Sequence, residues 1–248
     1  MPPVQGSGDT LALAGTPVVV RFTGRAEGDL ADPTGRDPVV TGRRRAIADR
    51  PWTWLRQAHG ARVVVVHEPG DAAGEEADAA VSSHPGAVLA VFVADCAPVA
   101  FASPEGVFGV AHAGWRGLLA GVVPATVDAM RRLGATGVRA ALGPCVHAEC
   151  YRFGASDLEL VAGRLGGAVR ARDHEGRPAL DLQAAVRLAV EGAGAVLDHD
   201  AGVCTACSEG HWSWRARRDE ARQAVAAWRG ADTATSPPSG TWGARHGG

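Results

Sequence analysis

Short apolar runs alternate with amphipathic stretches along the central part of the chain. Runs rich in Val, Ala and Phe predict strands at 17–22, 61–67, 87–93, 98–102, 107–112 and 138–142. Apolar residues at helical spacing predict helices at 118–133, 155–165, 182–192 and 219–228. The polar segment 24–41 is rich in Gly and Asp and is predicted as a loop. The pattern predicts a mixed α/β fold without an internal repeat.

The two ends of the chain differ in composition from its middle. Residues 1–15 and 231–248 are rich in small residues, Gly and Pro, which is typical of segments that pack loosely. We therefore predict a flexible N-terminus over 1–15, one domain over 16–230 and a disordered tail over 231–248. A chain of 248 residues that is 46% hydrophobic and 21% charged has ample material for a buried core.

Composition and charge exclude several classes of partner. No apolar run approaches the roughly 18 residues that span a bilayer, and MPPVQGSGDT has neither the charge nor the apolar core of a secretory signal. These features predict a cytoplasmic protein without a membrane partner. The 25 basic residues nearly balance the 27 acidic ones, which argues against a nucleic-acid partner.

Every basic residue is Arg, because the chain contains no Lys, and it contains no Asn either. These absences exclude a Schiff-base lysine, a P-loop lysine and an N-glycosylation acceptor. Recognition of phosphate would depend on Arg, His or backbone N–H groups.

The cysteines do not form the pattern of a disulfide framework. Their number is odd, at five, and the chain is neither short nor predicted to be secreted. Only Cys204 and Cys207 make a C-x-x-C, and a zinc ribbon needs a second such pair. We predict that Cys204 and Cys207 are buried thiols.

Three short polar motifs interrupt the predicted strands. QAHG at 57–60 precedes one strand, ADCAP at 94–98 separates two others, and HAGWRG at 112–117 joins a strand to a helix. Polar residues at such junctions lie at one rim of a sheet, where binding sites collect. Each motif alone is explained by ordinary packing or turn geometry.

Together the motifs offer His59, Cys96 and His112 as metal ligands. Two imidazoles and one thiolate suit Zn²⁺, and three protein ligands leave the fourth tetrahedral position open. A closed structural site would need a further ligand from elsewhere in the sequence. Candidates are His67, His84, Cys145, His147 and Cys204.

In order and spacing, QAHG, ADCAPV and HAGWRG resemble the laccase-domain family, whose members were labelled multicopper polyphenol oxidases and later assigned as zinc-dependent purine nucleoside phosphorylases. The resemblance covers roughly residues 54–223 and continues through LGPC at 142–145, YRFG at 151–154, DL at 181–182, CT at 204–205 and SWR at 213–215. It implies a layered α/β/β/α sandwich with two inner mixed β-sheets and outer helices in a single domain.

The resemblance implies a set of site residues and a reaction. It implies that His59, Cys96 and His112 hold zinc and serve catalysis. It also implies that phosphate cleaves purine nucleosides (adenosine, inosine, guanosine or 5′-methylthioadenosine), with adenosine deamination as a second activity. Gln57 and Asp95 are expected to hold the ligands or the strand end in place. Substrate contacts are expected from Arg25, Arg116, Tyr151, Arg215 and Arg222.

The sequence departs from the family pattern in the regions expected to contact substrate. The segment 26–46 is shorter than its family counterpart and lacks the family's asparagine-containing motif. Trp214 replaces a tyrosine, and Glu220 and Ala221 replace the Thr-Gly that precedes the family arginine. The resemblance therefore supports the metal site more strongly than the substrate pocket, and the sequence leaves the oligomeric state open.

Other interpretations remain open from the residues alone. Cys96 with a histidine base would make an amide hydrolase that resists chelators. Copper is the weaker metal, because the nine histidines include no His-Cys-His and no His-x-His element. The site could also be a non-catalytic zinc-binding module.

Overall fold

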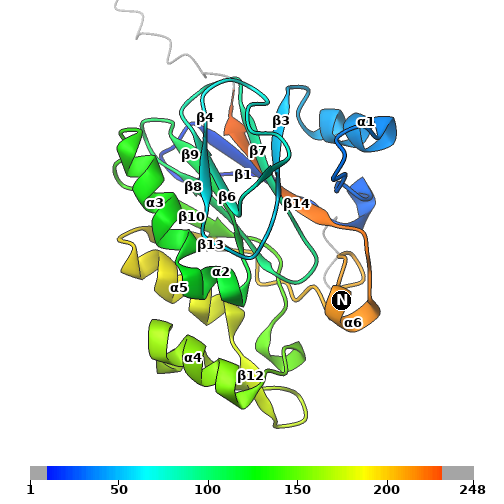
Figure 1. Ribbon diagram of the computed structural model, residues 1–248, viewed down its shortest axis with the longest axis vertical. Helices are drawn as coiled ribbons and strands as arrows, with labels where there is room; N and C mark the ends of the chain where they lie inside the picture. The colour runs from blue at the N-terminus through cyan, green and yellow to red at the C-terminus, as the bar shows by residue number, and fades with distance from the viewer. Residues whose placement is uncertain (1–9, 231–248) are drawn as a thin grey trace, which may run out of the picture.

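The structure is a computed structural model, and it describes residues 10–230. Two six-stranded sheets lie against each other, with helices outside them (Figure 1). Both sheets contain parallel and antiparallel strand pairs. The predicted fold class, an α/β/β/α sandwich with two inner mixed sheets, is confirmed.

The first sheet has the order β1-β2-β14-β7-β3-β5. Its strands are β1 (Thr10–Ala12), β2 (Val18–Phe22), β14 (Gln223–Arg229), β7 (Val88–Val93), β3 (Trp52–Arg56) and β5 (Glu75–Glu76). The long strand β14 pairs antiparallel with both β2 and β7, so the end of the described chain lies in the middle of this sheet.

The second sheet has the order β13-β10-β8-β9-β6-β4. Its strands are β13 (Val196–Asp200), β10 (Arg139–Leu142), β8 (Ala97–Ala102), β9 (Phe108–Ala113), β6 (Ala79–Ser82) and β4 (Val63–Val66). Strands β8 and β9 pair antiparallel with Pro98 opposite His112, which brings the ADCAP and HAGWRG motifs to the same edge.

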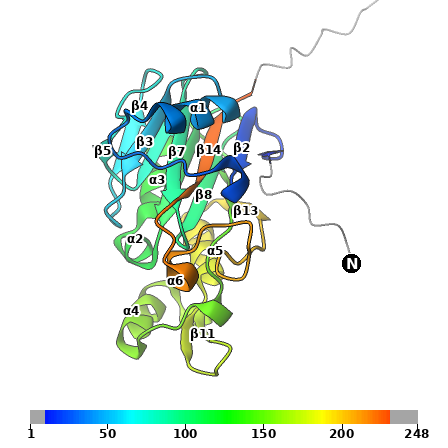
Figure 2. The same ribbon diagram turned by 90° about the vertical axis from the view of Figure 1, so that its right-hand side faces the viewer.

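The helices lie outside the sheets and at one end of the molecule (Figure 2). They are α1 (Pro38–Ile47), α2 (Trp115–Ala120), α3 (Val122–Arg132), α4 (Ala155–Leu165), α5 (Leu182–Gly192) and α6 (Trp214–Arg217), with 3-10 turns η1 (Arg25–Glu27), η2 (Ala148–Cys150) and η3 (Gly167–Val169). A small hairpin of β11 (Arg170–Arg172) and β12 (Pro178–Leu180) lies near α4. None of the helices among residues 10–230 has the length and apolar character that crossing a membrane requires.

Alternation along the strands explains the layers. On β8, Val99 and Phe101 face the helices, whereas Ala100 and Ala102 face the first sheet. On β7, Leu89 points toward the second sheet, while the alternate side chains belong to a separate cluster on the outer face. Because both faces of β7 and β8 are buried, their sequences are continuous apolar runs, and these runs predicted the two strands.

The predicted helix 118–133 is wrong in its continuity. The structure divides it into α2 and α3 at Gly121, which has φ 87°. A left-handed residue interrupts the helical hydrogen bonds, and Gly adopts this conformation at little cost. The helices predicted at 155–165 and 182–192 are confirmed as α4 and α5.

The predicted helix 219–228 is wrong, because residues 223–229 form β14. Its Ala-rich sequence favours a helix by propensity. Pairing with β2 and β7 and complete burial of 223–227 override that preference.

The predicted loop 24–41 and the predicted N-terminal boundary also need correction. The segment contains η1 and the start of α1, where Asp37 accepts a hydrogen bond from the Val39 N–H. The flexible segment was predicted to reach residue 15, but β1 begins at Thr10 and pairs with β2. Residues 1–9 and the tail 231–248 lie outside the described residues.

Candidate metal centre

Two loops and one strand bring His59, Cys96 and His112 together: His59 follows β3, Cys96 lies between β7 and β8, and His112 is near the end of β9. Their ligand atoms lie within 4.8 Å of one another, with the Cys96 Sγ 3.8 Å from the His59 Nε2. The two imidazole rings meet edge to face with centroids 4.7 Å apart. His112 is buried and His59 is exposed, so the cluster lies at the surface of the fold with one open side.

Asp78 fixes two of these three residues, although it belongs to none of the motifs identified in the sequence. Its Oδ1 lies 2.8 Å from the Nδ1 of His112 and accepts the backbone N–H of His59 at 2.9 Å. Its Oδ2 accepts the N–H groups of Ala58 and Gly60. Because Asp78 engages Nδ1, the Nε2 of His112 is the nitrogen available to a metal.

The electrostatics of the cluster favour a thiolate. Burial raises the pKa of Cys96, but the charge of His112 and hydrogen bonds from both histidines outweigh it and lower that pKa to about 6. Burial lowers the pKa of His112, whereas the Cys96 charge and the Asp78 hydrogen bond raise it to about 9. The thiolate and a protonated imidazole thus stabilise each other, and because a metal ligand must be deprotonated, metal binding would displace a proton from His112.

The glycines of HAGWRG are needed for close approach. A Cβ on Gly114 would lie 3.0 Å from the His59 Cδ2 and 3.1 Å from the Cys96 Sγ. A Cβ on Gly117 would lie 3.2 Å from the Gly60 carbonyl oxygen. The turn packs directly against the other two ligand loops, which a larger residue would push apart.

Gln57 and Asp95 hold the loops that carry the ligands. The Gln57 amide donates to the Phe92 carbonyl at 2.7 Å and accepts the Phe92 N–H at 2.8 Å, joining the His59 loop to β7. Asp95 has φ 98°, an unfavourable conformation for a non-glycine residue. Its carboxylate accepts the Thr205 hydroxyl at 2.7 Å and the Arg215 N–H at 2.6 Å, which offsets that cost.

A cavity of about 800 Å³ adjoins the His59, Cys96 and His112 cluster. This volume lies in the range of small-molecule sites. The cavity is lined by the cluster itself and by Trp54, Phe92, Trp115, Arg116, Tyr151, Arg215 and Arg222, among others. It therefore combines aromatic surface with arginine side chains, among them Arg116, Arg215 and Arg222, beside the candidate metal ligands.

The predicted substrate residues differ in how they are held. Arg116 lies over the Trp115 ring and Arg215 over the Tyr151 ring, each 4.4 Å from the centroid. Burial and the Cys96 charge raise the pKa of Tyr151, and Arg215 opposes this, so the phenol stays protonated.

Arg222 and Arg25 are engaged by the protein itself. Arg222 donates through Nη1 to three backbone carbonyls and still lines the cavity. Arg25 is absent from the cavity lining; its Nη2 pairs with Asp219 at 2.6 Å and its guanidinium lies 4.1 Å from the Trp212 ring centroid. Its position indicates support for the loop before α6.

Comparison with known proteins gives consistent matches over most of the chain. Residues 36–230 match the family model for multi-copper polyphenol oxidoreductase laccase. A purine nucleoside phosphorylase of Streptomyces coelicolor is 38% identical over 211 residues, which cover 81% of this chain and 87% of that protein. A purine nucleoside phosphorylase of Streptomyces griseus is 37% identical over 212 residues, covering 81% and 86%.

Solved structures share the fold. The crystal structure of a Neisseria meningitidis protein of the DUF152 family superposes with a TM-score of 0.77 at 25% identity, covering 91% of this chain and 100% of that one. YlmD from Geobacillus stearothermophilus superposes with a TM-score of 0.74 at 25% identity, covering 88% and 94%.

Proposed function

The chain belongs to the multi-copper polyphenol oxidoreductase laccase family, and from this membership and the site geometry we propose that it catalyses phosphorolysis of purine nucleosides. The observation that carries the proposal is one cavity that joins the His59–Cys96–His112 cluster to several arginines, among them Arg116 and Arg215. Relatives 37% and 38% identical to this chain are named purine nucleoside phosphorylases.

The donor set fits zinc. A thiolate and two imidazoles match the ligands that Zn²⁺ prefers, and among residues 10–230 no fourth His, Cys or acidic ligand joins this group. His59, Cys96 and His112 would hold the ion. When bound, zinc supplies positive charge and Lewis acidity at this side of the cavity.

The chain's own residues would bind and orient both reactants. Arg116 and Arg215 are exposed in the cavity and offer guanidinium groups to phosphate. Because the chain contains no lysine, arginine is the side chain that can provide this positive charge. A phosphate oxygen forms a bond to the ribose anomeric carbon, while the bond from that carbon to the base nitrogen breaks and its electron pair leaves with the base. Tyr151 offers a protonated hydroxyl as a hydrogen-bond donor to the substrate.

The proposed substrates are adenosine, inosine, guanosine and 5′-methylthioadenosine. Trp54, Phe92 and Trp115 line the cavity and provide apolar surface for a purine. Adenosine deamination is proposed as a second activity of the same site.

Product analysis tests this proposal. Zinc-loaded protein is incubated with each nucleoside, with and without phosphate, and the products are separated by chromatography. Free base and ribose 1-phosphate that appear only with phosphate are the expected result. Inosine formed from adenosine without phosphate reports deamination, and no turnover of any of the four nucleosides would refute the proposal.

The site supports a second candidate, a cysteine-dependent amide hydrolase. Cys96, His112 and Asp78 form a thiolate–imidazole–carboxylate series, and the low pKa of Cys96 suits a nucleophile. Removal of metal by a chelator distinguishes the two. Loss of activity that zinc restores supports phosphorolysis by a zinc enzyme, whereas activity that survives the chelator and is lost on thiol alkylation supports the hydrolase.

The remaining alternatives have their own tests. Oxidation of a phenol that depends on added copper would support a copper oxidase. For a non-catalytic zinc module, His59→Ala should unfold the protein. For a catalytic site, the same variant should keep the fold and lose turnover.

A further inference from the structure

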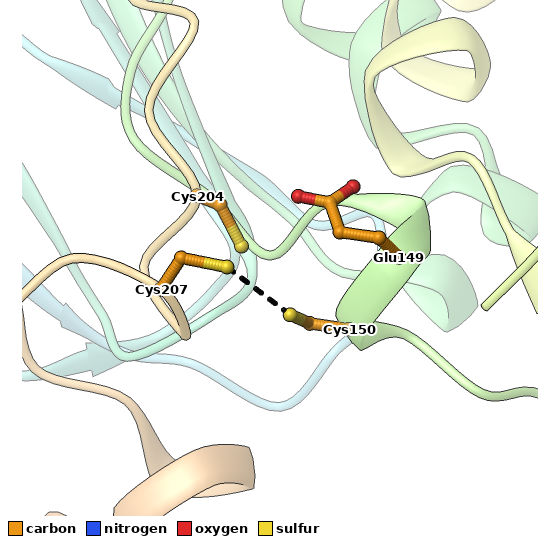
Figure 3. Close-up of side chains that lie close together, drawn as sticks. All are labelled: Glu149, Cys150, Cys204 and Cys207. Atoms are coloured by element: carbon orange, nitrogen blue, oxygen red, sulfur yellow. Dashed lines mark hydrogen bonds between the residues drawn. The ribbon is translucent and has the colours of Figure 1, made fainter. Parts of the chain in front are cut away.

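A second cluster of metal-ligating side chains lies outside the centre described above. Glu149, Cys150, Cys204 and Cys207 place one ligand atom each within 4.8 Å of one another. Figure 3 shows Glu149 and Cys150 projecting from the η2 turn toward the two cysteines of a separate loop. We propose that this cluster binds a second zinc ion, which is structural and shares no ligand with the His59–Cys96–His112 centre.

The distances fit a tetrahedral ion with little adjustment. Zn–S bonds of about 2.3 Å at tetrahedral angles separate sulfur atoms by about 3.8 Å. The Sγ atoms of Cys150 and Cys207 are 3.3 Å apart, so a shift of about half an ångström accommodates the ion. Three thiolates and one carboxylate fill four positions, which makes a closed site.

The composition of the cluster selects zinc among the thiolate-binding metals. Thiolates alone also suit Cu(I), but a carboxylate is a hard ligand that Cu(I) disfavours and Zn²⁺ accepts. Three converging sulfurs also exceed what a disulfide requires. A Cys150–Cys207 disulfide would leave Cys204 facing the pair without a role.

The backbone around Cys204 is arranged for a thiolate. The N–H of His147 points at the Cys204 Sγ from 3.4 Å. Burial keeps the pKa of Cys204 above its usual value, and backbone hydrogen bonds from His147, Cys207 and Ala206 offset only part of that rise. N–H groups directed at a cysteine sulfur stabilise the charged form that a metal requires.

The loop that carries Cys204 and Cys207 is fixed before any metal binds. Arg217 donates to the carbonyls of Thr205, Ala206 and His211 at 2.6–3.0 Å. Glu149 and Cys207 are exposed, so an ion can enter from solvent.

The second ion would join two segments that serve the first centre. Tyr151, which lines the cavity, directly follows Cys150. Thr205 directly follows Cys204 and donates to Asp95, the neighbour of the ligand Cys96. Zinc between η2 and this loop would hold in place the two segments that carry Tyr151 and Thr205.

Metal stoichiometry tests the proposal. The full chain is produced with zinc, purified without chelator and measured by inductively coupled plasma mass spectrometry. We expect two equivalents of zinc in the wild type, one in Cys96→Ser, one in Cys207→Ser and none in the double variant. Cys145→Ala is the matched control, because Cys145 lies outside both clusters and should leave two equivalents.

The outcomes are distinct from those of the proposed function. One equivalent in the wild type, lost in Cys96→Ser and kept in Cys207→Ser, would overturn the second site and leave the first intact. A Cys150–Cys207 disulfide in the zinc-loaded protein, found by mass spectrometry after alkylation, would also overturn it.

Spectroscopy of the cobalt-substituted protein provides a second measurement. In Cys96→Ser, added Co²⁺ should produce thiolate-to-cobalt charge-transfer absorption, because three sulfurs remain at the second cluster. Glu149→Gln should weaken cobalt binding while leaving that absorption in place. Cys207 is exposed, so its replacement by Ser should not prevent folding, which thermal unfolding checks.

Discussion

Asp78→Asn is the sharpest test of how the first metal centre is built. The carboxylate accepts four N–H donors, two on each oxygen. Asparagine keeps the size of the side chain but replaces one acceptor oxygen with an NH₂ donor. Either orientation of the amide is therefore unfavourable.

If the amide oxygen faces His112, the N–H groups of Ala58 and Gly60 meet an NH₂ group and lose their acceptor. If the NH₂ group faces His112, the Nδ1 must accept and the Nε2 carries the proton, which blocks it from the metal. The N–H groups of Ala58 and Gly60 are only partly buried, so the loss of their acceptor costs less than the about 1–3 kcal/mol expected for each fully buried donor. Loss of such a supporting carboxylate typically weakens metal binding about 10–100-fold.

The assay is competition for zinc against a chromophoric chelator, performed on the Cys207→Ser protein so that only the first centre contributes. We expect zinc affinity to fall by about 10–100-fold, together with a lower thermal unfolding temperature. Asp181→Ala is the control: it removes the N-cap of α5, which costs about 1 kcal/mol, and contacts neither cluster. Unchanged zinc affinity in Asp78→Asn would refute the role assigned to this carboxylate.

Further predictions concern the turn, the cavity and stability. Gly114→Ala should weaken zinc binding, because its Cβ would crowd two ligands. The control is Gly163→Ala in α4, where a Cβ meets nothing within 4 Å; it should keep zinc affinity and stabilise the fold by about 0.5–1 kcal/mol. Equal zinc affinity in the two variants, measured by the same competition, contradicts this reasoning. Arg116→Ala should raise the KM for phosphate more than the KM for nucleoside in steady-state assays. A change confined to the nucleoside KM would show that Arg116 does not bind phosphate. Hydrogen bonds from Thr34 and Asp37 hold the pKa of Asp32 well below its usual range, so its contribution to stability is present at neutral pH and is lost as the pH falls below about 4. Denaturant unfolding of Asp32→Asn should show less loss of stability across that acid range than the wild type, and parallel profiles would contradict it.

The errors in the predicted elements have two physical origins. Residues 223–229 carry helix-favouring Ala and Gln, and only their place between two strands makes them β14. The break at Gly121 was visible as a glycine, but helical spacing continued across it. At 223–229, burial between distant strands outweighs local propensity, whereas at Gly121 a local left-handed conformation ends the helix despite the apolar spacing.

The site shows the same division. Asp78 lies inside a buried apolar run, and a charged residue there is a sequence signal that a partner must exist. Nothing in the sequence indicates that this partner is His112, 34 residues away. The sequence predicted that Cys204 and Cys207 of the C-x-x-C are buried thiols, and this is wrong for Cys207, which is exposed. Its neighbour Cys150 is 57 residues away in the chain, so the sequence did not indicate their contact.

The sequence by itself determined the alternating strands and helices, the family, and the three motifs that hold His59, Cys96 and His112, because these depend on local pattern and short spacing. Only the tertiary structure decided which carboxylate orients the ligands, which arginines reach the cavity, and that Glu149, Cys150, Cys204 and Cys207 meet. Those relations join segments far apart in the chain, and their positions are set by how the two sheets and their loops pack.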